Sequence, residues 1–136
     1  MHLILTGATG LVGASVLDSM LAQEGISRIS ILSRRPVKMA EGHKKATVIL
    51  HNDFMKYDQP LLDKLKDAHG CVWALGISQN AVNKECVMAV HSHAAVQADC
   101  RARQYFEITH DYPLAAARAF STLHPESPFT FVHVSS

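Results

Sequence analysis

The sequence predicts an α/β protein built on a doubly wound parallel sheet of about five strands. Three observations support this. Short apolar, β-branched segments alternate with segments of helical periodicity along the chain. The strand segments are apolar on both faces, which is typical of central parallel strands covered by helices on each side. A glycine-rich turn joins the first strand to the first helix.

The elements follow from local signals. The expected strands are Leu3–Thr6, Arg28–Leu32, Ala46–Leu50, Cys71–Leu75 and Phe129–Val134. The expected helices are Leu11–Glu24 closed by Gly25, a helix capped by Asp58 and closed by Gly70, the alanine-rich stretch Lys84–Phe106, and a helix starting at Asp111-Tyr-Pro113. Val12, Val16 and Met20 are predicted as the inner stripe of the first of these helices, widened by Leu17 and Leu21. Leu114, Ala117 and Phe120 are predicted as the inner stripe of the last. Residues 37–45 are expected to form a loop with at most a helical turn.

Composition narrows the class of protein. The length of 136 residues predicts one domain, and a net charge of +1 indicates neither a nucleic-acid partner nor an anionic membrane. No apolar run approaches the ~20 residues of a membrane span, and no signal peptide is expected. The three cysteines form no C-x-x-C pair and the nine histidines no ligand cluster, so we expect reduced, buried thiols and no metal.

The turn Thr6-Gly-Ala-Thr-Gly-Leu-Val-Gly13 carries the most specific signal. Its glycines have the spacing G-x-x-G-x-x-G, a close variant of the dinucleotide-binding fingerprint. Residues without a Cβ let the backbone approach a pyrophosphate, and the following helix offers free N–H groups and the positive end of its dipole. The alternative is a turn that serves only the structure.

The second strand ends in Ser33-Arg34-Arg35-Pro36. In a dinucleotide fold this position lies near the adenosine ribose, where an acid accepts hydrogen bonds from a free 2′-hydroxyl and arginine suits a 2′-phosphate. Two arginines and no acid favour NADP(H) over NAD(H). The alternative is a pair of solvated surface arginines.

Two further strand ends are candidate cofactor contacts. Asp53, after the third strand, offers a carboxylate for the adenine amino group, or else forms an Asx-turn at the strand end; both readings are open. Gly76, after the fourth strand, would let the backbone pass close to the cofactor. Trp73 is expected to be a core residue.

Together with Phe131-Val-His-Val-Ser-Ser136, these motifs give the chain a specific resemblance. It resembles the N-terminal part of an atypical short-chain dehydrogenase/reductase with an NAD(P)-binding Rossmann fold. It is similar to small proteins of the Tat-interacting-protein type and their mitochondria-associated fungal relatives. The resemblance implies a cofactor-binding domain over residues 1–136 whose sheet is incomplete on its C-terminal side.

The resemblance and the motifs together define the candidate cofactor contacts. They are Thr6, Gly7, Thr9, Gly10, Leu11, Val12, Gly13, Ser33, Arg34, Arg35, Asp53, Phe54, Ala74, Leu75 and Gly76. The family's catalytic serine would correspond to Ser135 or Ser136, for which a polar terminal pair is the alternative reading. The family's Tyr-x-x-x-Lys pair is absent from this chain.

The function expected from these residues is an NADP(H)-binding module of a reductase-like protein with impaired or no catalysis. The alternatives are an active carbonyl reductase completed by oligomerisation, and a non-catalytic redox-sensing protein that acts through a partner. The expected location is cytoplasmic, or mitochondria-associated by the resemblance. Residues 86–103 are read as an insertion relative to the family pattern.

Overall fold

The computed structural model describes residues 1–76, 102–123 and 126–134. Their centre is one sheet of five strands in the order β3-β2-β1-β4-β5, with every neighbouring pair parallel. The strands are β1 (His2–Thr6), β2 (Arg28–Ser33), β3 (Ala46–Leu50), β4 (Gly70–Trp73) and β5 (Thr130–His133). This is the predicted doubly wound sheet, and the strand order reverses direction between β1 and β4.

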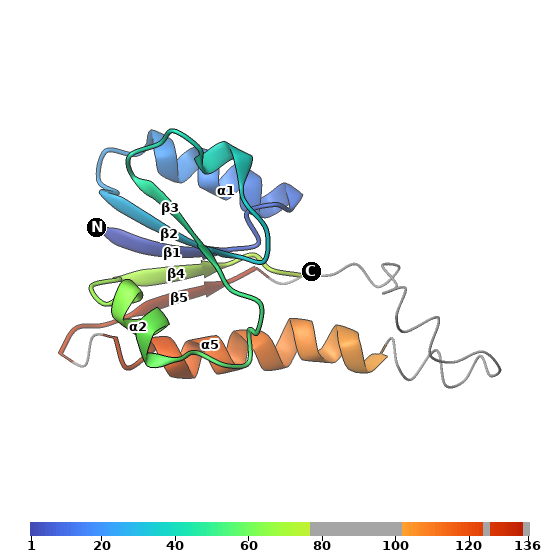
Figure 1. The fold of residues 1–136 in the computed structure, drawn as a ribbon. Helices are drawn as coiled ribbons and strands as arrows, with labels where there is room; N and C mark the ends of the chain where they lie inside the picture. The colour runs from blue at the N-terminus through green and yellow to red at the C-terminus, as the bar shows by residue number, and fades with distance from the viewer. Residues whose placement is uncertain (77–101, 124–125, 135–136) are drawn as a thin grey trace.

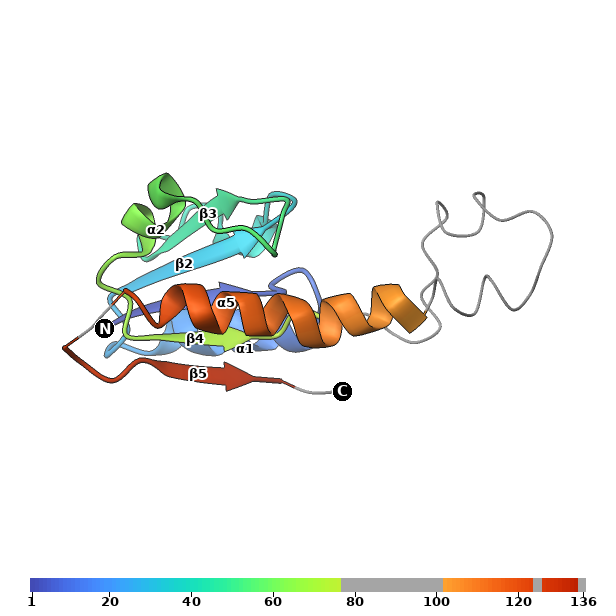
Figure 2. The ribbon, with the colours of Figure 1, turned by 90° about the horizontal axis from the view of Figure 1, so that it is seen from below.

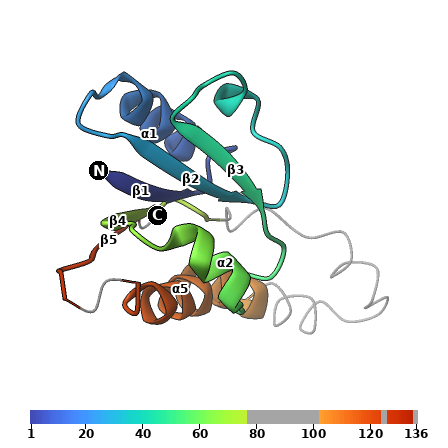
Figure 3. The ribbon, with the colours of Figure 1, turned by 60° about the vertical axis from the view of Figure 1, so that its left-hand side comes forward.

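Helices cover both faces of the sheet (Figures 1 and 3). The helix α1 (Leu11–Ala22) and the short 3₁₀ turn η1 (Lys38–Ala40) lie on one face. The helices α2 (Gln59–Leu65) and α5 (Tyr112–Phe120) lie on the other. Two apolar cores result, one on each side of the sheet, and the inner strands contribute buried side chains to both.

Helix α1 differs from the prediction at Val12 and at its end, while Val16, Leu17, Met20 and Leu21 pack in or against the core as expected. Gly13, Leu17 and Met20 are its buried residues, whereas Val12 is 49% exposed. The helix ends at Ala22 with Gln23 as C-cap in an extended conformation, so the predicted glycine cap at residue 25 is wrong. No left-handed residue is needed there, because the chain leaves the helix through extended backbone.

The start of α2 confirms the predicted cap. Asp58 Oδ1 accepts a hydrogen bond from the Leu61 N–H at 3.1 Å, and proline occupies the first turn. The predicted end is wrong, because the helix stops at Leu65 and Gly70 is the first residue of β4. A Cβ at Gly70 would lie 2.8 Å from the carbonyl oxygen of Thr130, so this glycine serves the close pairing of β4 with β5.

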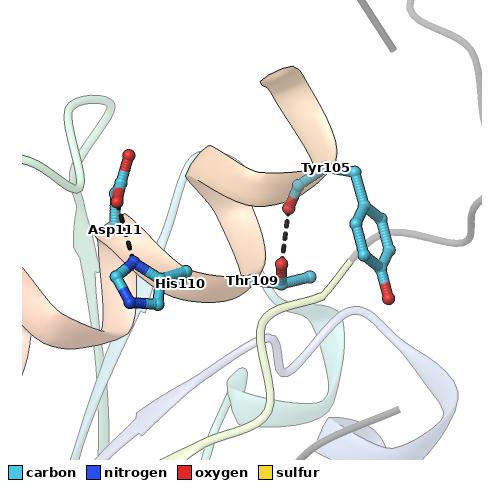
Figure 4. A network of polar contacts seen from close by, with 4 residues as sticks. All are labelled: Tyr105, Thr109, His110 and Asp111. Atoms are coloured by element: carbon cyan, nitrogen blue, oxygen red, sulfur yellow. Dashed lines mark hydrogen bonds and ion pairs between the residues drawn. The ribbon is translucent and has the colours of Figure 1, made fainter. Parts of the chain in front are cut away.

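The helix before β5 is continuous where a new helix start was expected. Residues 102–106 are helical, the π-helical turn η2 (Glu107–Asp111) follows, and α5 continues to Phe120 (Figure 2). The Thr109 hydroxyl donates to the Tyr105 carbonyl at 2.6 Å, and His110 Nδ1 lies 2.9 Å from Asp111 Oδ1 (Figure 4).

The inner face of α5 is also shifted from the prediction. Its buried residues are Pro113, Ala116 and Phe120, while Leu114 is 40% exposed. Phe120 was predicted on the inner face, whereas Pro113 and Ala116 were not. The buried set still follows helical spacing, so the period was right and the phase was wrong.

The part of the chain that the structure describes contains no helix long and apolar enough to cross a membrane. Cys71 is buried and free, and burial raises the pKa of its thiol, which agrees with the expected reduced, buried cysteine. The other two cysteines and residues 86–101 of the expected insertion lie outside the described residues, as does most of the alanine-rich stretch.

Candidate cofactor-binding site

The glycine turn between β1 and α1 depends on two glycines. Gly7 has φ +74°, a left-handed conformation, and a Cβ there would overlap the Ala74 carbonyl at the end of β4. A Cβ on Gly13 would overlap the Gly7 carbonyl, so α1 packs directly on the turn. These contacts hold the turn tightly against the carboxyl end of the sheet.

The N-terminus of α1 is open at this turn. Gly10 is its N-cap and makes no side-chain cap, and the first turn contains no acidic residue. The Gly10 N–H donates to the Gly7 carbonyl at 3.0 Å, and the first hydrogen bond into the helix runs from Ala14 to the Gly10 carbonyl at 2.9 Å. Three backbone N–H groups therefore have no partner within the helix, which is the arrangement that binds anions.

The exposure of the turn residues divides them into two groups. Thr9, Gly10 and Leu11 are exposed, Leu11 at 89%, so their backbone is accessible from solvent. Thr6 is fully buried and its carbonyl accepts a hydrogen bond from the Ala74 N–H at 3.3 Å. Thr6 thus links β1 to β4 beneath the turn.

The end of β2 presents two arginines beside the turn. Ser33 is buried and its Oγ accepts a hydrogen bond from the Arg35 N–H at 3.2 Å, which shapes the backbone of the bend. Arg34 and Arg35 are both exposed. Within the described residues, neither guanidinium has a carboxylate partner or a hydrogen-bond acceptor.

Pockets at the carboxyl end of the sheet connect these groups. A narrow pocket of about 30 Å³ is lined by Gly7, Thr9, Leu32, Ser33, Arg34, Arg35, Phe54 and Leu75. A second pocket, of about 260 Å³, is lined by Arg34, Phe54, Leu75, Gly76, Gln104, Glu107, Ile108 and Tyr112. The two share three residues and therefore adjoin. We call the larger one the base pocket.

Beyond the narrow pocket that they share, the two arginines line different pockets. Arg34 lines the base pocket, whereas Arg35 lines a separate pocket of about 390 Å³ together with Thr9 and Lys38. Lys38 stands at the start of η1 and was not among the expected contacts. Its position four residues after Arg34 in a basic stretch is the signal that could have found it.

Asp53 adopts the Asx-turn that was one of its two readings. Its Oδ1 accepts a hydrogen bond from the Met55 N–H at 3.0 Å, and its carbonyl accepts one from the Lys56 N–H at 3.2 Å. Asp53 is not among the residues that line either adjoining pocket. Its contact with adenine stays a prediction.

Aromatic rings form the floor of the base pocket. Phe54 is 2% exposed and contacts Trp73 edge-on at 6.0 Å between ring centroids, with Tyr112 tilted over it at 5.9 Å. Trp73 is fully buried, as expected of a core residue. Partial burial and the nearby Glu107 carboxylate raise the pKa of Tyr112, so its hydroxyl is a donor at neutral pH.

Four lining residues were missed from the sequence. Gln104, Glu107, Ile108 and Tyr112 come from the helix before β5 and line the base pocket. Gln104, Ile108 and Tyr112 have the spacing of one helix face, but nothing local shows that this face turns toward β2 and β4 or that Glu107 joins it. Ser135 and Ser136, the candidate catalytic serines, lie outside the described residues.

The described residues contain no group of three or more histidine, cysteine or acidic side chains that could hold a metal ion. The site as described is therefore a glycine turn, an open helix N-terminus, two arginines and an aromatic-floored pocket at the end of a parallel sheet.

The fold is that of nicotinamide-dinucleotide-binding short-chain dehydrogenases and related epimerases. A short-chain dehydrogenase from Burkholderia cenocepacia, solved with NADP, matches with a TM-score of 0.73 and 20% identity over 99% of this chain and 53% of its own. A UDP-glucuronic acid 4-epimerase from Bacillus cereus, solved with NAD, matches with a TM-score of 0.68 and 14% identity over 100% of this chain and 40% of its own.

A curated relative extends the comparison to sequence. The chain is 43% identical over 136 residues to leucinostatins biosynthesis cluster protein T of Purpureocillium lilacinum. The match covers 99% of this chain and 42% of the relative, so the chain spans less than half of that protein's length. No protein-family model matches the sequence.

Proposed function

We propose that this chain is the NADP(H)-binding module of an oxidoreductase of the short-chain dehydrogenase/reductase type. The observation that carries the proposal is the packing of the glycine turn. Gly7 and Gly13 leave no room for a Cβ, and the N-terminus of α1 behind them is uncapped. A pyrophosphate fits such a cradle because it needs close backbone approach and unpaired N–H donors.

The basic residues at the end of β2 support NADP(H) over NAD(H). Arg34 and Arg35 flank the narrow pocket next to the glycine turn, and Lys38 adds a third cation on the side of Arg35. A 2′-phosphate accepts charge-assisted hydrogen bonds from such groups, whereas a free 2′-hydroxyl is bound best by a carboxylate. The lining of the narrow pocket includes no carboxylate.

Bound cofactor would supply hydride transfer, and the residues described here would hold and orient its adenosine half. We further propose that the 136-residue chain binds without turnover. In it, Tyr57, Tyr105 and Tyr112 are each followed at the fourth place by a residue other than lysine. In the Tyr-x-x-x-Lys arrangement the lysine lowers the tyrosine pKa for proton exchange with substrate.

Two alternatives have their own support. The relative's name places it in a biosynthesis cluster, which favours an active reductase. That reading requires NADPH oxidation with some carbonyl compound, and cofactor binding without turnover over a broad carbonyl panel would contradict it. Within the described residues β5 is an edge strand with Val132 47% exposed. Such an edge can pair with another chain, which favours a redox-sensing protein that acts through a partner. A stable monomer unchanged by NADPH would contradict that reading.

Calorimetric titration of the purified chain with NADPH and with NADH tests the proposal. We expect NADPH to bind at least about tenfold more tightly, because two charge-assisted contacts are lost without the 2′-phosphate. Arg34→Glu and Arg35→Glu should each reduce the preference. Arg118→Glu makes the same charge change at an exposed position on α5 and should leave it unaltered. Equal affinity of the parent for both cofactors would refute the assignment.

A further inference from the structure

The helix before β5 carries a π-helical turn where it borders the base pocket. The Tyr112 N–H donates to the Glu107 carbonyl, a hydrogen bond that spans five residues. In a regular α-helix of 3.6 residues per turn, positions five apart would point about 140° away from each other. The wider π turn instead places Glu107 and Tyr112 one above the other, and both line the base pocket.

Pro113 explains why the wider turn is there. It has no N–H to donate to the Thr109 carbonyl, and in an α-helix its ring would collide with that carbonyl. Pro113 is buried at the start of α5, so its ring is anchored in the core. The sequence therefore specifies the π turn through Pro113. The turn carries residues that line the base pocket, and π turns are frequent at functional sites.

The base pocket combines an apolar floor with a polar rim. Phe54, Leu75 and Ile108 supply flat apolar surface, and Glu107, Tyr112 and Gln104 supply polar groups. Within the described residues, the Glu107 carboxylate makes no hydrogen bond and no ion pair. A planar heterocycle with an exocyclic amino group matches this lining, since its faces are apolar and its edge is polar.

We propose that Glu107 and Tyr112 read the amino edge of the adenine base, with the Glu107 carboxylate accepting from the 6-amino group and the Tyr112 hydroxyl donating to a ring nitrogen. The inference rests on the proposed function, which puts the ribose and its 2′-phosphate beside Arg34. The base is bonded to that ribose, so it enters the pocket that Arg34 also lines. In this proposal Glu107 makes the contact with the adenine amino group that strand-end position had suggested for Asp53.

The cofactor analogue with hypoxanthine in place of adenine distinguishes this contact from general binding. Its carbonyl oxygen replaces the amino group and would face the Glu107 carboxylate, acceptor against acceptor. We expect the parent to bind NADPH about tenfold more tightly than this analogue. In Glu107→Gln the side chain offers both a donor and an acceptor, so the ratio should fall to within about twofold.

Controls separate recognition from folding. Glu24→Gln makes the same change at an exposed site after α1 and should keep the parent ratio. Tyr112→Phe keeps the ring on Phe54 and removes the hydroxyl, so it should weaken NADPH binding without changing the preference for NADPH over NADH. Thermal melts of each variant would confirm that it is folded.

The outcomes are distinct for the two proposals. A parent that prefers NADPH to NADH yet binds the hypoxanthine analogue equally well would overturn this inference alone. A ratio unchanged by Glu107→Gln would overturn it too. A parent that binds no dinucleotide would overturn the proposed function, and with it the assignment of the pocket.

Discussion

Gly13 and Gly25 both lie near α1, and their surroundings predict opposite effects of the same substitution. In general, alanine at a helical glycine stabilises by roughly 1 kcal/mol. At Gly13 the added Cβ would overlap the Gly7 carbonyl, which is backbone and cannot move aside cheaply. We expect Gly13→Ala to lower the free energy of unfolding by about 1–3 kcal/mol and to weaken dinucleotide binding.

The matched control is Gly25→Ala. No atom lies within 4 Å of a Cβ built there, and its φ is not positive, so we expect no loss of stability. Urea denaturation of both variants measures the difference. A Gly13→Ala variant as stable as the parent would show that α1 does not pack on the turn as described.

His2 gives a pH-dependent prediction at the same scale. It is 5% exposed, and its Nε2 lies 2.7 Å from Ser30 Oγ. Burial, followed by the nearby Arg28 charge, lowers the pKa of His2 from 6.5 to about 4. Between these values the unfolded chain binds a proton that the folded chain does not, so the unfolding free energy falls as pH drops from 6.5 toward 4.

The substitution His2→Gln removes this titration and retains a polar side chain for Ser30. Between pH 7 and pH 5 we expect the parent to lose about 1–2 kcal/mol more stability than the variant. Denaturant titrations at both pH values measure this difference, in which the other titrating groups cancel. An equal loss in both proteins would place His2 in contact with solvent.

At the scale of elements, the helix before β5 shows how one residue alters a binding surface. Pro113→Ala restores an N–H that can donate to the Thr109 carbonyl, so the helix can regain α-helical hydrogen bonding. Glu107 and Tyr112 would then point apart. We expect the variant to lose the discrimination between NADPH and its hypoxanthine analogue while keeping the preference for NADPH over NADH, because the arginines lie on another element.

Pro60→Ala is the control for that change. Pro60 occupies the first turn of α2, where a proline costs no hydrogen bond, so its replacement should alter neither ratio. A crystal structure of Pro113→Ala would show the new hydrogen bond directly. A retained π turn in that structure, or unchanged discrimination against the analogue, would contradict the role given to Pro113.

At the scale of the whole molecule, the parallel sheet brings the site together. The carboxyl ends of β1, β2 and β4 meet at one edge, which places the glycine turn, Arg34 and Leu75 around adjoining pockets although they are far apart in sequence. The helix of residues 102–120 runs along the same face of the sheet as α2 (Figure 2), and its residues Gln104, Glu107, Ile108 and Tyr112 line the base pocket. This edge, where the strand order reverses, is where open α/β sheets bind ligands.

The sequence by itself determined the strands, their parallel arrangement and the glycine turn, because apolar runs, caps and left-handed glycines are local signals. It also indicated the basic end of β2. The buried face of a helix was predicted less accurately, since Val12 and Leu114 are exposed although local periodicity placed them inside. The side of a helix that is buried depends on where the sheet lies, and that is not a local property.

Only the tertiary structure decided which acid faces the base pocket. For Asp53 the strand-end position left an adenine contact and an Asx-turn equally open, and its Oδ1 accepts a hydrogen bond from the Met55 N–H in such a turn. Glu107, more than fifty residues later in the sequence, lines the pocket instead. The physical reason is the π turn before Pro113, which brings Glu107 to the side of the helix that carries Tyr112. That side borders the pocket because the fold places this helix beside the ends of β2 and β4.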